Sequence, residues 1–186
     1  AVKYMPRRER ADLDALYAAG GSDRVALYLN YERQEESGVY VDGQTYLPAA
    51  WVDANLNERF YWDANEEILV YALPEEIVKS DETTVDEDGK KILYRDGDAV
   101  YLSLALIQKY TDVRLQAYDG EAQKRVFVEN NWDPVTVADA AWSAKIRLRG
   151  GLKSPIVTEI KRGGTVTVLE QYDNWARVMT PDGHIG

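Results

Sequence analysis

Residues 39–71 read VYVDGQTYLPAAWVDANLNERFYWDANEEILVY, and a fainter copy returns at residues 92–128 as ILYRDGDAVYLSLALIQKYTDVRLQAYDGEAQKRVFV. In each copy, two β-rich pieces meet at an Asp-Gly turn signal, and a stretch with apolar residues at helical spacing follows. A second pair of β-rich pieces closes each copy. The pattern predicts the order β-β-α-β-β twice, with helices within residues 47–57 and 102–110.

Three regions are expected along the chain. Because each copy is short, the two copies are expected to share one core, which predicts an α+β domain of tandem units over residues 25–142. Residues 1–24 are expected to be a linker with a helix over 6–19. From residue 143 to 186 the texture changes to short strands separated by Gly and Asp-Gly turns, which predicts an all-β small barrel.

Composition narrows the function classes. The net charge is −10, and residues 25–80 alone carry −8, with three Lys and Arg against eleven Asp and Glu. Such a segment repels nucleic acid and anionic lipid. The absence of cysteine excludes disulfides, thiolate zinc sites and cysteine nucleophiles. No apolar run is long enough for a membrane-spanning helix, so no membrane insertion is expected.

Two groups of residues carry a resemblance over about residues 25–132. They are Val39-Tyr40-Val41-Asp42-Gly43 followed by Tyr46-Leu47-Pro48, and the hairpin that begins at Trp62-Asp63. This part resembles the copper amine oxidase N-terminal-like domain, a stalk domain of secreted and surface proteins of Gram-positive bacteria. The resemblance implies neither metal binding nor amine oxidation. The second copy departs from the pattern at Ser103, where proline is usual.

The tail resembles a bacterial SH3 domain through Trp175-Ala176-Arg177-Val178 and the run from Asp182-Gly183 to Gly186. Its strand pattern is still running at the last residue, so a final strand is expected to lie beyond this sequence. The order of the two parts is similar to the N-terminal region of membrane-anchored glycosyl hydrolase family 18 (chitinase-like) proteins. The resemblance implies an extracellular, cell-surface location and a catalytic domain downstream in the parent chain.

No catalytic residues and no metal site are expected in these 186 residues. A catalytic triad or a multi-histidine metal site needs a well-placed imidazole, and the only histidine, His184, lies in a turn that we expect at the surface. An EF-hand around Asp86-Glu87-Asp88-Gly89 would need oxygen ligands where Thr84 and Arg95 stand. No cofactor is expected either.

Three aromatic residues are the candidates for ligand binding. Trp62 precedes a turn, and an exposed indole can stack on a sugar ring. Tyr172 and Trp175 flank a turn in the tail, where they could contact a peptide. Trp51 lies on the apolar face of its predicted helix and is expected in the core. The expected partners are cell-wall polysaccharide or peptidoglycan peptide.

The sequence therefore predicts a non-catalytic accessory region of an extracellular glycosyl hydrolase, acting as a spacer and a cell-envelope binding module. Two alternatives stay open at this point. Abundant carboxylates are compatible with a stand-alone glycosidase, which needs two carboxyl groups about 5 to 10 Å apart across a sugar cleft. A pure protein-interaction module is the other alternative.

Overall fold

The computed structural model describes residues 5–17, 21 and 23–186. These residues form two compact units. We call residues 18–131 the acidic unit, because it carries 23 Asp and Glu against 11 Lys and Arg, a net charge of −12. We call residues 1–17 together with 132–186 the terminal unit. This division groups the N-terminal segment with the tail, unlike the ranges expected from the sequence.

The protein is mostly β, which corrects the fold class predicted from the sequence. Strands account for 46% of the structure and helices for 11%, and the strands form several sheets. The expected α+β domain of repeated β-β-α-β-β units is therefore wrong. Two short helices do lie within the predicted ranges, α2 (Ala49–Asn55) and α3 (Leu104–Tyr110), but they are minor elements between sheets.

A seven-stranded sheet organises the acidic unit, in the order β7-β8-β3-β2-β1-β10-β9. Its neighbours are antiparallel except β1 and β10, which run parallel. The strands are β1 (Arg24–Leu29), β2 (Glu32–Val41), β3 (Gln44–Pro48), β7 (Leu93–Asp96), β8 (Ala99–Ser103), β9 (Arg114–Tyr118) and β10 (Arg125–Glu129).

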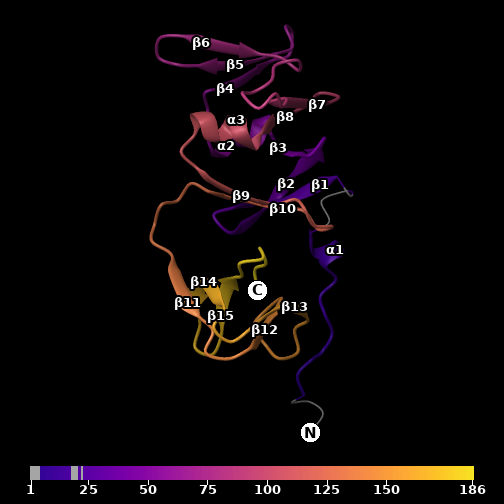
Figure 1. Ribbon diagram of the computed structural model, residues 1–186, viewed down its shortest axis with the longest axis vertical. Coiled ribbons are helices and arrows are strands. Elements are labelled where there is room, and N and C mark those ends of the chain that lie inside the picture. The colour runs from indigo at the N-terminus through magenta and orange to yellow at the C-terminus, as the bar shows by residue number, and fades with distance from the viewer. Residues whose placement is uncertain (1–4, 18–20, 22) are drawn as a thin grey trace. The chain divides into compact units, whose positions relative to one another are not determined.

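The two copies of the sequence pattern use their second hairpins differently, which is why they are not equivalent units. In the first copy, β4 (Phe60–Asp63) and β5 (Ile68–Ala72) leave the large sheet and pair with β6 (Ile77–Ser80) in a separate three-stranded sheet. In the second copy, the β9-β10 hairpin joins the large sheet beside β1. In Figure 1 this small sheet, β4-β5-β6, lies on the other side of α2 and α3 from β1, β2, β9 and β10.

The core of the acidic unit joins the two copies. Leu47 on β3 pairs with Leu102 on β8, which in turn pairs with Leu93 on β7, and all three side chains are buried. Trp51 is buried on α2, as predicted, and its indole N–H donates to Gln34 Oε1 at 3.1 Å. Since these three paired leucines come from both copies, neither copy can keep its core without the other.

Ser103 explains how the second copy starts its helix without proline. Its Oγ accepts a hydrogen bond from the backbone N–H of Leu106 at 3.1 Å and so caps α3. In the first copy, Pro48 stands at the same point before α2 and provides no side-chain cap. Serine and proline therefore begin equivalent helices by different means, one by capping and one by restricting its backbone.

The strands of the terminal unit form two sheets, which corrects the predicted SH3-like small barrel. One sheet has the order β11-β14-β15, and the other is the hairpin β12-β13. The first strand, β11, lies within the range expected for the tandem domain, and it pairs with β14 at the edge of its sheet. The strands are β11 (Thr136–Asp139), β12 (Ala144–Arg147), β13 (Ile156–Ile160), β14 (Thr165–Gln171) and β15 (Ala176–Met179).

The N-terminal helix is shorter than the predicted range 6–19, since α1 covers Leu13–Tyr17. Residues 18–20 lie outside the described residues. The backbone before α1 forms hydrogen bonds with other segments of the terminal unit: Arg7 N–H donates to Leu152 O at 2.7 Å, and Ala11 N–H donates to Ile156 O at 2.6 Å. These bonds hold the segment in an extended form, so the helix does not begin at residue 6 as predicted.

None of the described helices is long and apolar enough to span a membrane.

Candidate functional site

Trp62 lies in a cleft of about 340 Å³, which we call the Trp62 cleft. The cleft opens between the small sheet, the first turn of α2 and the β7-β8 turn. Phe60, Trp62 and Leu69 line it from the small sheet. Trp62 pairs with Leu69 across β4 and β5. The volume is within the range of small-molecule and cofactor sites, so this is a place where one or two sugar rings could fit.

Three carboxylates line the same cleft. They come from different elements: Asp53 from α2, Glu58 from the loop before β4, and Asp98 from the turn between β7 and β8. All three residues are exposed, which leaves their oxygens accessible to a ligand. Carboxylate oxygens accept hydrogen bonds only, so they match a ligand that presents hydroxyl or N–H donors.

Arg95 holds the indole of Trp62 from one side. Its guanidinium carbon lies 5.2 Å from the ring centre, and its Nη1 lies 3.2 Å from the Glu67 carboxylate. A cation over an aromatic face fixes the ring electrostatically. Trp62 is half-buried and also packs against the hydrophobic core, so only the part of the indole that lines the cleft is open to a ligand.

Tyr101 closes another side of the cleft and is itself fixed. Its ring is buried, and its hydroxyl accepts a hydrogen bond from Arg24 Nη1 at 2.9 Å. This hydrogen bond to Tyr101 raises the pKa of Arg24. Arg24 Nη2 also lies 3.7 Å from Asp96. The aromatic walls of the cleft are thus held in place before any ligand arrives.

The neighbouring Tyr61 also lines the Trp62 cleft, but its side chain leaves β4 on the other face from Trp62. Side chains alternate between the faces of a strand, so Phe60 and Trp62 point toward α2 and α3 while Tyr61 points to the opposite face. Tyr61 is 63% exposed, whereas Phe60 is 3% exposed. Tyr61 and Trp62 therefore do not share one face of β4, although both line the cleft.

Tyr172 and Trp175 belong to the terminal unit, on the turn between β14 and β15. Tyr172 is 54% exposed, and its hydroxyl donates to Glu170, which raises the pKa of Tyr172. Trp175 is 36% exposed and packs beside Gly150. The backbone N–H of Tyr172 donates to Trp175 O at 2.7 Å. The turn therefore presents two exposed aromatic rings.

His184 is buried, which corrects the prediction that it lies at the surface. Its Nδ1 lies 2.7 Å from the Tyr17 hydroxyl, and its Nε2 lies 3.7 Å from Asp182 Oδ2. These contacts tie α1 to the end of the terminal unit. Within the described part of the chain, no group of three or more His, Asp or Glu side chains could hold a metal ion.

The sequence pattern singled out Trp62 but missed the carboxylates around it. Asp53, Glu58 and Asp98 occupy three separate segments, and nothing in their spacing signals that they share a cleft. Asp98 belongs to the second copy of the repeated pattern, whereas Asp53 and Glu58 belong to the first. The expectation that the two copies share one core was therefore the only sequence signal that could have placed Asp98 near the other two.

Comparisons of this chain with family models, curated proteins and solved structures found no match.

Proposed function

We propose that this chain is a non-catalytic binding region that holds a carbohydrate chain in the Trp62 cleft. The observation that carries the proposal is one fixed indole surrounded by three carboxylates from separate elements. The C–H face of a sugar ring packs on an aromatic face, and its hydroxyl groups donate hydrogen bonds to carboxylate oxygens. The cleft offers both kinds of contact at once.

The charge of the acidic unit narrows the carbohydrate class. With a net charge of −12, the unit disfavours polymers that carry phosphate, sulfate or uronic acid groups. A chain of neutral or N-acetylated amino sugars meets no such repulsion, and its amide N–H groups add hydrogen-bond donors. The sugar strands of chitin and of peptidoglycan belong to this class.

We also propose that the region works outside the cell, at the cell surface, as a spacer ahead of a catalytic domain. This proposal rests on the sequence motifs that resemble those of stalk and SH3 domains, and not on the fold. The exposed Tyr172 and Trp175 are the residues of the terminal unit that we assign to contact with a peptide of the cell wall. In this view the chain itself performs no chemistry.

The test is a pull-down on insoluble chitin and on peptidoglycan, with reducing ends measured in the same tubes. The 186-residue chain should bind at least one of the two polymers without releasing reducing ends. Trp62→Ala should weaken binding about tenfold, equivalent to about 1.4 kcal/mol. Trp142→Ala is the control: it removes an indole of the terminal unit that is 75% exposed and does not line the Trp62 cleft, and it should change binding by less than twofold.

Each other outcome points to a different function. Release of reducing ends that disappears on replacing Asp53, Glu58 or Asp98 would make the chain a glycosidase. Retention that is equal for Trp62→Ala and wild type would remove the cleft from the proposal. Neither retention nor release would favour a protein-interaction module.

A further inference from the structure

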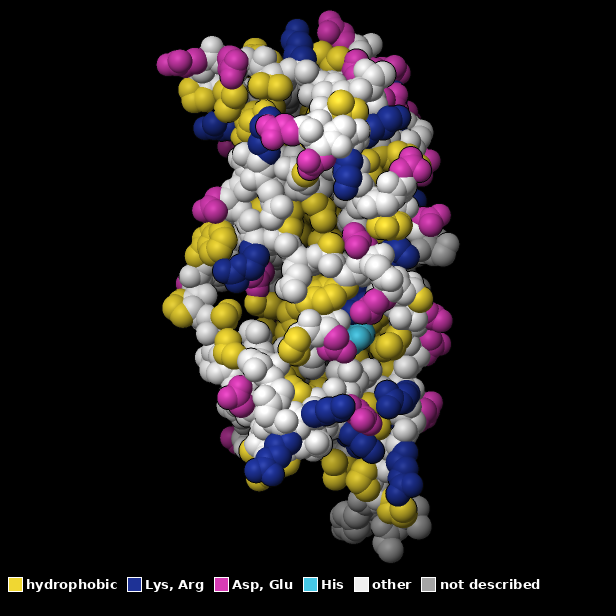
Figure 2. Space-filling view, in the orientation of Figure 1, with side chains coloured by type: hydrophobic (Ala, Val, Ile, Leu, Met, Phe, Trp, Pro, Cys, Tyr) yellow, Lys and Arg dark blue, Asp and Glu magenta, His cyan; other side chains and the backbone are white. Residues whose placement is uncertain are grey.

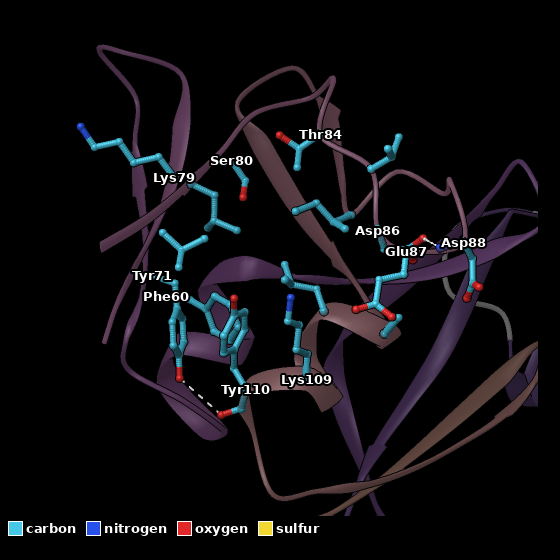
Figure 3. A pocket seen from close by; sticks show the side chains of 16 residues that line it. Phe60, Tyr71, Lys79, Ser80, Thr84, Asp86, Glu87, Asp88, Lys109 and Tyr110 are labelled. Atoms are coloured by element: carbon cyan, nitrogen blue, oxygen red, sulfur yellow. Dashed lines mark hydrogen bonds between the residues drawn. The ribbon is translucent and has the colours of Figure 1, made fainter. Parts of the chain in front are cut away.

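A second cavity of about 440 Å³ lies against the same face of the small sheet, and we call it the Tyr71 cavity. Phe60, Tyr71 and Tyr110 form an aromatic cluster in its wall (Figure 3). Tyr71 stacks on Tyr110 with ring centres 4.1 Å apart, and Phe60 lies 4.7 Å from Tyr71. Asn57 Nδ2 donates to the Tyr71 hydroxyl at 3.0 Å and to Tyr110 O at 3.2 Å. The apolar wall is thus fixed by packing and hydrogen bonds.

The polar groups of the Tyr71 cavity stand around this apolar wall. In Figure 3 the Lys109 side chain reaches into the cavity, and Glu87 approaches it from the other side. The Lys109 amine lies 5.4 Å from the centre of the Tyr110 ring. An amine in this position can donate to a carbonyl oxygen of a ligand whose apolar group fills the aromatic wall.

An edge strand borders the cavity. Strand β6 is the last strand of the small sheet, so one side of its backbone is not paired within that sheet. Val78 and Ser80 on β6 line the cavity with their side chains, whereas the Lys79 side chain points away in Figure 3. Lys79 therefore lines the cavity with its backbone. Such an edge can accept an extended peptide as a further strand.

The turn at the mouth of the cavity is acidic and exposes one apolar side chain. Asp86 is engaged in the turn, since its Oδ1 accepts from the N–H groups of Asp88 and Lys90 at 2.9 and 3.0 Å. Glu87 and Asp88 are exposed, and Val85 is 52% exposed beside them. Figure 2 shows acidic, basic and hydrophobic side chains intermixed at the end of the acidic unit that carries β5 and β6, where residues 75–91 hold seven Asp and Glu against three Lys. This end therefore suits a partner that is both basic and apolar.

We propose that the Tyr71 cavity and the edge of β6 bind an extended basic peptide. One large apolar side chain of the peptide enters the cavity, and a Lys or Arg next to it meets Glu87 and Asp88. The peptide backbone pairs with β6, and Lys109 donates to one of its carbonyl oxygens. Charge complementarity selects this occupant, because the acidic unit carries −12 and would repel an acidic peptide.

The experiment measures fluorescence anisotropy of a labelled peptide, Gly-Arg-Lys-Phe-Lys-Arg-Gly, with the 186-residue chain at low salt. We expect saturable binding that weakens at least tenfold when alanine replaces the phenylalanine, and that is lost when glutamate replaces the basic residues. Ala105→Trp should also weaken binding at least tenfold, because Ala105 is an exposed residue of α3 at the cavity and the indole would occupy its space.

Charge reversal with a matched control separates a local contact from general attraction. The double variant Glu87→Lys and Asp88→Lys should weaken binding about tenfold. The double variant Glu35→Lys and Glu36→Lys makes the same charge change on exposed positions of β2 and should weaken it less than threefold. The proposal would be overturned if the two double variants lost the same amount of peptide affinity, or if replacing the peptide's phenylalanine by alanine left the affinity unchanged. An absence of binding would overturn it as well.

A second measurement does not depend on variants. Peptide titration of the wild-type chain, followed by amide NMR shifts, should move the signals of β6 and of residues 86–88 first. Shifts elsewhere would refute this location. The peptide proposal stands apart from the carbohydrate proposal, because Trp62→Ala should leave peptide affinity within twofold. Ala105→Trp, in turn, should leave retention on chitin or peptidoglycan unchanged.

Discussion

Replacement of Leu102 by alanine tests whether the acidic unit folds as one piece. Leu102 has no exposed surface and lies between Leu47 on one neighbouring strand and Leu93 on the other. Both neighbours are held by their own strand pairing, so they cannot close over the gap. Leu→Ala changes at such sites cost about 3 kcal/mol, within a range of about 2 to 5. The free energy of unfolding of the acidic unit should fall by about this amount.

Amide hydrogen exchange measures this loss of stability separately in each strand. A loss of about 3 kcal/mol accelerates exchange through global unfolding about 150-fold. If the seven-stranded sheet is one cooperative unit, the slowest amides of β1 and of β8 should accelerate by the same factor, although these strands lie far apart in the sequence. Leu152→Ala is the control, because that side chain is 50% exposed, and its cost should stay within about 0.5 kcal/mol.

The reasoning fails if Leu102→Ala accelerates exchange in β7 and β8 but leaves β1 and β10 protected. That result would mean that two parts of the seven-stranded sheet unfold separately, and that the pairing of β3 with β8 does not couple them.

Two further predictions concern a close backbone contact and a half-buried phenol. Gly38→Ala should destabilise the acidic unit by about 1 to 3 kcal/mol in chemical denaturation, because the new Cβ would lie 2.9 Å from Tyr46 O. Gly120→Ala is the control and should cost far less, because its new Cβ would have no atom within 4 Å. Equal losses of stability in the two variants would contradict this prediction. Burial, together with a hydrogen bond to Glu129, raises the pKa of Tyr31 to about 12. Since the phenol of the unfolded chain ionises near pH 10, the free energy of unfolding should fall as pH rises from about 10 to 12. Tyr31→Phe should make this decrease with pH smaller. An unchanged decrease in the variant, or phenolate absorbance of Tyr31 near pH 10, would contradict the assignment.

Local features of the fold were readable from the sequence because neighbouring residues decide them. The Asp42-Gly43 signal is a tight turn in which both residues have positive φ, 49° and 80°. The apolar spacing around Trp51 produced a helix with that indole buried. Turn geometry and helix periodicity depend on residues within about four positions of each other, so a single sequence contains the information.

Sheet membership was decided only by tertiary structure. The hairpins β4-β5 and β9-β10 have similar sequence patterns, yet one joins β6 and the other joins β1. The parallel pairing of Leu27 with Val126 brings together residues far apart in the chain. A strand's residue pattern indicates which of its faces is apolar, but it does not indicate which sheet edge the strand will pair with. That choice depends on every other strand in the unit.

The same division applies to the candidate sites. Trp62 could be singled out because a large aromatic beside a turn is a local feature of the sequence. The cleft around it depends on Asp53, Glu58 and Asp98, which come together only because the small sheet folds over α2 and the β7-β8 turn. The Tyr71 cavity likewise needs β6, the acidic turn and α3 at one place. The sequence by itself determined the turns, the two helices and the acidic charge; the tertiary structure decided which side chains share a cavity, because long-range packing alone sets those distances.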